Sequence, residues 1–494
     1  MISDSSSNVI LSTLTGLSFP HDFNREIALT TFFHDVFWVI TAPIITSKDV
    51  SAGHQYCRPY SFKNLLYTFV SVDLIDLFMS IDNSTARKGG RGMDSLEYSE
   101  QMRDSLVNFL SRLIKTPSLS GHEENVVVLI RDEMEKLGFD EVFVDNFGNV
   151  IGRIGSGKTR IAIDGHVDTV DIGDEKQWQR DPFSGEFDDE WVYGRGAADQ
   201  KAGVACAVYA GRVIKDLDLI DDFTLYVVGS ALEENCDGLC WQYIVKEGGI
   251  RPDYVLITEP TNLALARGQR GRLEFKINVK GVSAHASAPE RGVNAIYNMA
   301  KIALEIEKLN EKLPRDEFLG KGSIAITQIS SRSPSLNAVP DFCSAHVDRR
   351  LTNGEDKETV LQQMNNLLHE LPVDAHIEVC TFSDPTHTGL VYPAEKYFPS
   401  WVMPEDHVLL RAAKECFERL FNEEAEIGKW VFSTNGVATC GLFSIPTVGF
   451  GPGEERFAHA PNERVRIDHL VKATAFYSVF PQILVKSLKN ERGN

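Results

Sequence analysis

One histidine and one aspartate stand at a spacing that suits a metal site. His166 and Asp168 lie in the stretch DGHVDTV, directly after the run 160–163, which predicts a buried strand. Two residues apart on an extended segment, their side chains point the same way, so His166 can bind a metal while Asp168 lies close enough to contact this ligand. Taken alone, the pair is also typical of a hydrogen-bonded cap at the end of a strand.

A second motif, VYGRGAADQKAG, favours the metal site. It carries Asp199 among Gly194, Gly196 and Gly203, in a stretch with little side-chain bulk. Such glycines are expected where the backbone must come close to a bound ion.

Further metal-binding side chains occur downstream. Glu233, Glu234 and Glu259 each follow a strand-like apolar run, and His459 lies in FAHAPNE, beyond the glycine-rich GFGPG. Alone, paired glutamates are typical of a solvated helix start, and a histidine near a proline is typical of a loop. Together with the first two motifs they form a set of carboxylate and imidazole donors that suits zinc, manganese or cobalt.

The ordered motifs HxD, GRGxxDxK, EE, EP and AHxPNE resemble one family of metal-dependent enzymes. These are the amidohydrolases and peptidases of the acetylornithine deacetylase, succinyl-diaminopimelate desuccinylase and carboxypeptidase G family, and the resemblance covers roughly residues 100 to 485. The stretches CDGLCWQYI, RGQRGR, SAPERG, DEFLGKG and FSTNG are similar to its YgeY-type branch of hydrolases.

The resemblance implies a centre with two divalent metal ions. Zinc is expected, with cobalt or manganese as alternatives. Asp199 would bridge the ions, His166 and Glu259 would complete the ligands of one, and Glu234 and His459 those of the other.

The resemblance also implies catalytic roles. Glu233 would be the general base, Asp168 would orient His166, and the peptide bond between Asp199 and Gln200 would be cis. His285, in SAHAS, would reach the neighbouring subunit's active site and stabilise the tetrahedral oxyanion. A loop histidine that caps the following helix is the alternative interpretation of His285.

Three residues are expected to contact the substrate. Asn337 in SLNAVPD and Arg349 in DRR match family positions that hold substrate oxygens, and the planar guanidinium suits a carboxylate. For Arg349 or Arg350 alone, a surface salt bridge is the simpler interpretation. Asn435 in FSTNG stands where many relatives carry an acidic residue.

The predicted elements favour an α/β fold with one inserted domain. Strands and helices alternate over 93–271 and resume over 391–494, which predicts a catalytic domain with a mixed, largely parallel sheet flanked by helices. Residues 272–390 follow the order strand, helix, strand, strand, helix, strand, typical of a ferredoxin-like α+β unit. The resemblance implies that this unit is a lid and dimerisation domain.

Residues 1–92 form an atypical N-terminal extension. Their apolar runs at 36–45 and 65–79 are interrupted by Pro43 or by aspartates and match neither a membrane span nor a signal peptide. They indicate either translation from too early a start codon or an appendage that packs on the enzyme. In the first case a chain beginning at Met93 is expected to fold and bind metal.

Composition restricts the partners and the compartment. The chain has 50 basic and 70 acidic residues and a formal charge of −20, which argues against nucleic acid and anionic membranes as partners. Its 8 cysteines include no CxxC pair, which predicts free thiols in the cytoplasm. The set of metal-binding residues and the resemblance together imply a homodimeric hydrolase that cleaves the linear amide bond of a small N-acyl or N-carbamoyl amino acid. The alternatives are a metal-dependent dipeptidase or aminopeptidase and, from another class, a non-catalytic metal-binding scaffold.

Overall fold

The computed structural model of the chain describes residues 94–492. These residues belong to one compact unit, Arg91–Asn494. The predicted N-terminal extension, residues 1–92, lies outside the described residues. The predictions for the catalytic domain and the inserted unit fall within them.

The larger of the two main sheets contains the strands that were predicted to end at metal ligands. Its strands are β1 (Glu141–Val144), β2 (Val150–Ile154), β3 (Thr159–His166), β5 (Phe223–Ser230), β6 (Tyr254–Ile257), β7 (Leu265–Gln269), β17 (Trp401–Val402), β18 (Ile427–Trp430) and β19 (Thr447–Gly449). Their order is β1-β2-β5-β3-β6-β19-β7-β17, with β18 also paired to β7. The central strands β5, β3, β6 and β19 run parallel, whereas β1, β2 and β17 pair antiparallel with their neighbours.

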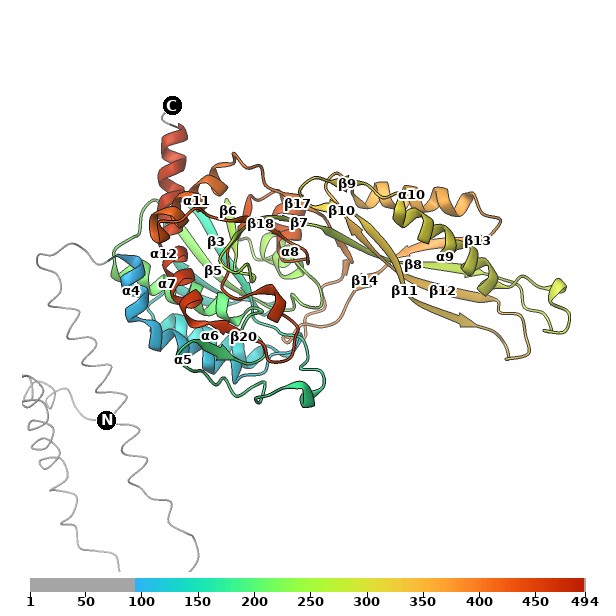
Figure 1. The fold of residues 1–494 in the computed structure, drawn as a ribbon, viewed down its shortest axis with the longest axis horizontal. Coiled ribbons are helices and arrows are strands. Elements are labelled where there is room, and N and C mark those ends of the chain that lie inside the picture. The colour runs from blue at the N-terminus through green and yellow to red at the C-terminus, as the bar shows by residue number, and fades with distance from the viewer. Residues whose placement is uncertain (1–93, 493–494) are drawn as a thin grey trace, which may run out of the picture. The chain divides into compact units, whose positions relative to one another are not determined.

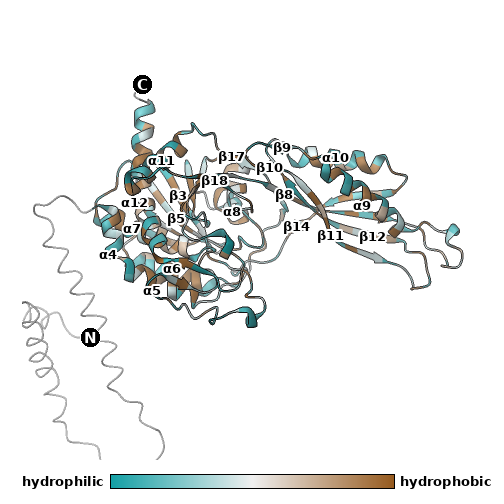
Figure 2. Cartoon of the chain, in the orientation of Figure 1, coloured by the Kyte–Doolittle hydropathy of each residue, from teal (hydrophilic) through white to brown (hydrophobic). Residues whose placement is uncertain are grey.

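Helices cover both faces of this sheet, as predicted (Figure 1). One face packs against α5 (Arg103–Ile114), α6 (Glu124–Lys136), α7 (Lys201–Asp216), α11 (Val408–Phe421) and α12 (Ile467–Arg492), and the other against α8 (Leu239–Lys246) and the helix Val437–Leu442. In β3, Ile161 and Ile163 belong to the first core and Ala162 to the second. Figure 2 shows hydrophobic residues in brown on the strands and on the helices that cover them. The α/β prediction is confirmed. The first helical segment is divided at Met102 into α4 (Ser95–Gln101) and α5.

The second main sheet has five strands and is antiparallel. Its strands are β8 (Gly271–Lys280), β11 (Ser323–Arg332), β12 (Phe342–Leu351), β13 (Asp374–Val379) and β16 (Tyr397–Phe398). Helices α9 (Ala295–Glu311) and α10 (Lys357–His369) share one core with β8 and β12. The elements follow one another in the order that the sequence predicts, and β11 forms one edge of the sheet.

Three short strand pairs lie outside the two main sheets among the described residues. They are β4 (Trp191–Tyr193) with β20 (Arg464–Arg466), β9 (Arg315–Asp316) with β10 (Gly320–Lys321), and β14 (Thr381–Phe382) with β15 (Ala394–Glu395). The pair β4 and β20 brings the GRGxxDxK and AHxPNE motifs together, because Tyr193 pairs with Arg464. No helix among residues 94–492 is long and apolar enough to cross a membrane. The seven cysteines within this range are free thiols.

Candidate metal centre

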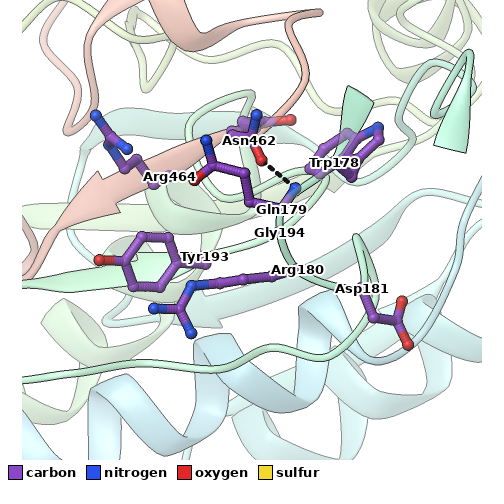
Figure 3. A pocket seen from close by; sticks show the side chains of 9 residues that line it. Trp178, Gln179, Arg180, Asp181, Tyr193, Gly194, Asn462 and Arg464 are labelled. Atoms are coloured by element: carbon purple, nitrogen blue, oxygen red, sulfur yellow. Dashed lines mark hydrogen bonds between the residues drawn. The ribbon is translucent and has the colours of Figure 1, made fainter. Parts of the chain in front are cut away.

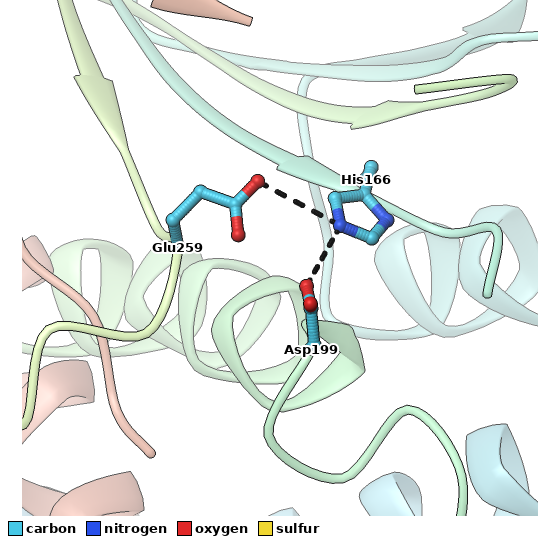
Figure 4. Close-up of side chains that lie close together, drawn as sticks. All are labelled: His166, Asp199 and Glu259. Atoms are coloured by element: carbon cyan, nitrogen blue, oxygen red, sulfur yellow. Dashed lines mark hydrogen bonds and ion pairs between the residues drawn. The ribbon is translucent and has the colours of Figure 1, made fainter. Parts of the chain in front are cut away.

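The five predicted ligands form two groups that share one aspartate. The groups are His166, Asp199 and Glu259, and Asp199, Glu234 and His459, each with its ligand atoms within 4.8 Å of one another. Oδ1 of Asp199 lies 3.0 Å from Nε2 of His166, and its Oδ2 lies 3.4 Å from Nε2 of His459. The Asp199 carboxylate therefore faces both groups, as a bridging ligand must (Figure 4 shows the first group).

Parallel strands assemble the first group. His166 ends β3 and Glu259 follows β6, and these neighbours run parallel, so their carboxyl ends meet at one edge of the sheet. Nε2 of His166 lies 3.7 Å from Oε1 of Glu259. The other ring nitrogen, Nδ1, lies 2.9 Å from the backbone oxygen of Asp168 and 3.5 Å from its Oδ1. With Nδ1 donating to Asp168, Nε2 carries the free lone pair that a metal needs.

The second group joins the loop after β5 to the C-terminal motif. Nε2 of His459 lies 3.0 Å from Oε2 of Glu234. Asp168 holds the loop that carries Glu234, because its Oδ1 accepts from the amide of Glu233 at 3.1 Å and its Oδ2 from the amide of Glu234 at 3.0 Å. Asp168 thus contacts His166, as predicted, and also anchors the paired glutamates.

The charge of this cluster calls for a cation. Burial, reinforced by neighbouring carboxylates, raises the pKa of Glu233, Glu234 and Glu259 above the usual value. Oε1 of Glu233 and Oε2 of Glu259 are buried without a hydrogen-bond partner. Buried carboxylates are stable in their charged form only when a cation or donors compensate them. Oxygen and imidazole donors in these numbers fit divalent ions of the zinc type.

Glu463 fixes the loop that presents Asp199. Its carboxylate accepts hydrogen bonds from the backbone amides of Gly196, Ala198 and Asp199 at 2.8 to 3.0 Å. It also pairs with Nη1 of Arg195 at 2.7 Å, and both side chains are buried. The peptide bond between Asp199 and Gln200 is cis, which confirms that prediction. Sequence reasoning missed the role of Glu463, although the residue stands in the AHxPNE motif.

The ligands open into a cleft with a volume of about 320 Å³. It is lined by His166, Asp199, Glu233, Glu234, Asp237, Glu259, Arg272, Arg350, Phe432, Ser433, Glu455, Ala458 and His459. Arg272 and Arg350 come from neighbouring positions on β8 and β12, so the second sheet forms one wall. Arg272 is held by Asp237, with Nη2 2.9 Å from Oδ2, and by the ring of Phe398, 4.4 Å from its guanidinium. The motifs RGQRGR and CDGLCWQYI contain this pair, which the sequence analysis did not assign.

A smaller hollow lies beside β4 and β20 (Figure 3). Its volume is about 20 Å³, and Oδ1 of Asn462 there accepts from the amide of Gln179 at 2.6 Å. This is room for about one water molecule, so the hollow is too small for a substrate.

The prediction that Arg349 binds the substrate is wrong. Its side chain is completely buried and pairs with Glu355. Residues of β12 alternate between two faces, and Arg349 continues the face of Val347 and Leu351, which packs into the helix-covered core. Arg350 is on the other face, lines the cleft and pairs with Asp348 at 2.8 Å.

The prediction that Asn435 binds the substrate is also wrong. The residue is buried and uses its hydrogen-bonding groups within the protein. Its Nδ2 donates to Oδ2 of Asp164 at 2.9 Å and to Oγ of Ser230 at 3.0 Å, while its Oδ1 accepts from the amide of Gly238 and from Sγ of Cys240. Other residues of the FSTNG stretch line the cleft instead.

His285 and Asn337 lie together outside the cleft. Both are exposed, and the backbone oxygen of Asn337 accepts from the amide of Ala286 at 2.9 Å. Nδ1 of His285 accepts from the amide of Ser287 at 3.1 Å, which leaves the ring proton on Nε2. Neither side chain contributes to the lining of its own chain's cleft.

Comparison with known proteins places these motifs in a family. The sequence pattern of peptidase family M20/M25/M40 matches residues 162–482. The chain is 48% identical over 386 residues to the uncharacterized protein YgeY of Escherichia coli (strain K12), covering 78% of this chain and 96% of that protein. It is 29% identical over 378 residues to acetylornithine deacetylase of Proteus mirabilis (strain HI4320), covering 73% and 91%. The fold is similar to that of the Bacillus subtilis YXEP protein, a dinuclear metal binding peptidase from the M20 family, with a TM-score of 0.59 and 16% identity over 78% of this chain and 99% of that one.

Proposed function

Because the chain belongs to peptidase family M20/M25/M40, we propose that it is a zinc-dependent hydrolase that releases an amino acid from an N-acyl or N-carbamoyl derivative. One observation carries the proposal: two ligand groups share Asp199, and Glu233 lies beside them without belonging to either. Oε2 of Glu233 is 4.0 Å from Nε2 of His166. An acid at this place is available to move a proton.

The roles of the residues follow from this arrangement. His166, Asp199 and Glu259 would hold one ion and Asp199, Glu234 and His459 the other. Two divalent ions held by these residues would supply Lewis-acid chemistry, which polarises a scissile carbonyl and lowers the pKa of an attacking water. The Glu233 carboxylate takes the water's proton and returns it to the leaving nitrogen, and its raised pKa suits both steps.

The residues that line the cleft favour an amino acid as the product. Arg350 lines the cleft, and its guanidinium pairs with Asp348 through Nε and Nη2, which leaves Nη1 for the carboxylate of an amino acid. The likeness to an acetylornithine deacetylase supports removal of an acyl group. The likeness to a dinuclear metal binding peptidase supports two ions.

A substrate panel tests this function. The purified protein, supplied with zinc, manganese or cobalt in turn, is incubated with N-acyl amino acids, N-carbamoyl amino acids and dipeptides, and amino-acid release is measured. We expect turnover of an acyl or carbamoyl derivative. Turnover of dipeptides alone would identify a peptidase, and no turnover with any metal would favour a metal-binding scaffold.

We further propose that the enzyme is a homodimer whose subunits complete each other's sites. His285 stands outside its own cleft with a proton on Nε2, the form that can donate to an oxyanion. Exposed apolar side chains lie on α9, on β11 and in the loop between β11 and β12, as expected of a self-complementary interface: Tyr297, Leu304, Ile329 and Leu336.

Mixing two inactive variants tests the shared site. Subunits with Glu233→Gln and subunits with His285→Ala are combined under conditions that allow exchange. In a mixed dimer, one site lacks both groups and the other is intact, so activity returns to about half per exchanged dimer. No recovery despite demonstrated exchange would mean that His285 acts in its own chain or not at all.

A further inference from the structure

The loop that carries Glu233 and Glu234 is held through consecutive backbone amides. Each amide donates to a side-chain oxygen from another part of the chain. The contacts are Ala231 to Oδ1 of Asn149 at 3.0 Å, Leu232 to Oε1 of Glu123 at 3.0 Å, Glu233 to Oδ1 of Asp168 at 3.1 Å, and Glu234 to Oδ2 of Asp168 at 3.0 Å.

These contacts hold an unfavourable backbone conformation. Leu232 has φ +64°, a region that side chains other than glycine adopt at a cost, and it is buried. A buried amide without an acceptor is also unfavourable. The Glu123 oxygen therefore supports the residue that directly precedes Glu233 in the chain.

Glu123 does not belong to the metal centre, because it contacts none of the proposed ligands' side chains. Its side chain is completely buried at the start of α6, and Oε1 also accepts from the amide of Gly121 at 2.9 Å. Its Oε2 lies 3.5 Å from Nδ1 of His387, and both atoms are buried without a hydrogen-bond partner. Burial, followed by the charge of Asp168, raises the pKa of Glu123 to about 8.

His387 reaches this place from a distant segment. It lies between β14 and β15, and its side chain is only 5% exposed. Gly148, at φ +109°, makes room for it, because a Cβ atom there would clash with the imidazole ring. The next residue, Thr388, donates from Oγ1 to the backbone oxygen of Asn146 at 2.7 Å. The His387 side chain is thus buried and held in one position.

We propose that Glu123 is a positioning residue for the hydrolytic reaction: it holds the amide of Leu232 and so aims the carboxylate of Glu233, while the His387 side chain lies beside its second oxygen. This inference rests on the proposed function, because it takes Glu233 as the base. Glu123 touches neither substrate nor ligand side chains, so its effect must pass through the loop.

Hydrogen–deuterium exchange of the loop tests this role without a substrate. In Glu123→Leu, loss of the acceptor is expected to speed exchange of the amides at 231–234 about tenfold. Glu123→Gln keeps an oxygen for Leu232 and is expected to stay near the wild-type rate. Glu133→Gln is the matched control, because Glu133 is a buried acid of α6 whose partners are Arg112, Lys136 and Tyr209. A folded Glu123→Leu protein with wild-type exchange, or an equal increase in Glu133→Gln, would overturn the proposal.

His387→Ala provides an independent test if Glu123→Leu does not fold. It leaves Oε2 of Glu123 without its neighbour and is expected to speed exchange of the same amides, and unchanged exchange overturns the proposal. Once a substrate is known, Glu123→Leu is expected to lower kcat about ten- to a hundredfold with KM and metal content near wild type. Glu123→Gln restores most of kcat. If metal content fell as much as kcat, Glu123 would position the ligand Glu234 rather than the base Glu233. If no substrate is turned over, the proposed function fails while the exchange result still stands.

Discussion

Replacing Glu463 by alanine is expected to destabilise the metal-free protein by about 3–5 kcal/mol, because the change leaves the buried charge of Arg195 without its partner. The pair is 2.7 Å long, and the two side chains are 2% and 0% exposed, so solvent screens it little. The same carboxylate accepts from the amides of Gly196, Ala198 and Asp199. These losses are not additive, because water can enter the space that alanine leaves.

Glutamine at position 463 separates the contribution of the ion pair with Arg195 from that of the hydrogen bonds with the backbone amides. Glu463→Gln keeps one acceptor oxygen and the shape, so a smaller loss of about 1–3 kcal/mol is expected. Glu190→Gln is the control, because Glu190 pairs with Arg466 in the same region but is 61% exposed, and its loss is expected to stay under about 1 kcal/mol.

The assay is denaturant unfolding of the metal-free proteins, followed by circular dichroism. The loop held by Glu463 carries Asp199, so metal affinity measured by calorimetry is also expected to fall about ten- to a hundredfold in Glu463→Ala. If Glu463→Ala were no less stable than Glu190→Gln, the buried pair would not stabilise this loop, and the reasoning would be refuted.

Three further predictions concern the charges of the site. Glu233→Gln is expected to lower kcat by about 100- to 10,000-fold with metal content near wild type, whereas Glu234→Gln lowers metal occupancy; metal analysis showing the reverse would exchange their roles. Asn435→Asp places a second carboxyl beside Asp164, whose pKa burial already raises to about 6. The pair folds best when protonated, so the stability deficit of this variant, measured by unfolding, is expected to grow as pH rises, and a constant deficit would contradict the repulsion. Because the pKa values of Glu233, Glu234 and Glu259 are raised without metal, metal binding is expected to release protons and to strengthen as pH rises. Calorimetry in buffers of different ionisation enthalpy checks this, and binding without proton release would show that the acids are already ionised.

The strand ends were predictable because the relevant rules are local. A buried apolar run followed by His166 or Glu259 indicates a parallel strand and the edge at which it ends. Parallel neighbours bring such ends together, so the ligand groups could be expected before their distances were known. The order of elements in the second sheet follows from the same local patterns, and the fold prediction was therefore right.

The sequence also shows on which face of β12 Arg349 lies, although the prediction did not use this information. Along β12 every second residue is apolar, and Arg349 falls on that series while Arg350 does not. The prediction rested on the presence of an arginine in the DRR motif. The alternation of side chains along a strand decides which of the two arginines can reach a cleft.

Contacts between distant segments were decided only by the tertiary structure. Asn435 is buried because Asp164, Ser230 and Gly238, up to 271 positions away in the chain, supply partners for its amide. Glu123 reaches the amide of Leu232 across 109 positions. No local period or motif encodes such a pairing, because it depends on how whole strands and helices pack. The sequence by itself determined which side chains could bind metal and at which strand ends they lie, and packing decided which other polar residues are free for a substrate and which are consumed in holding the site.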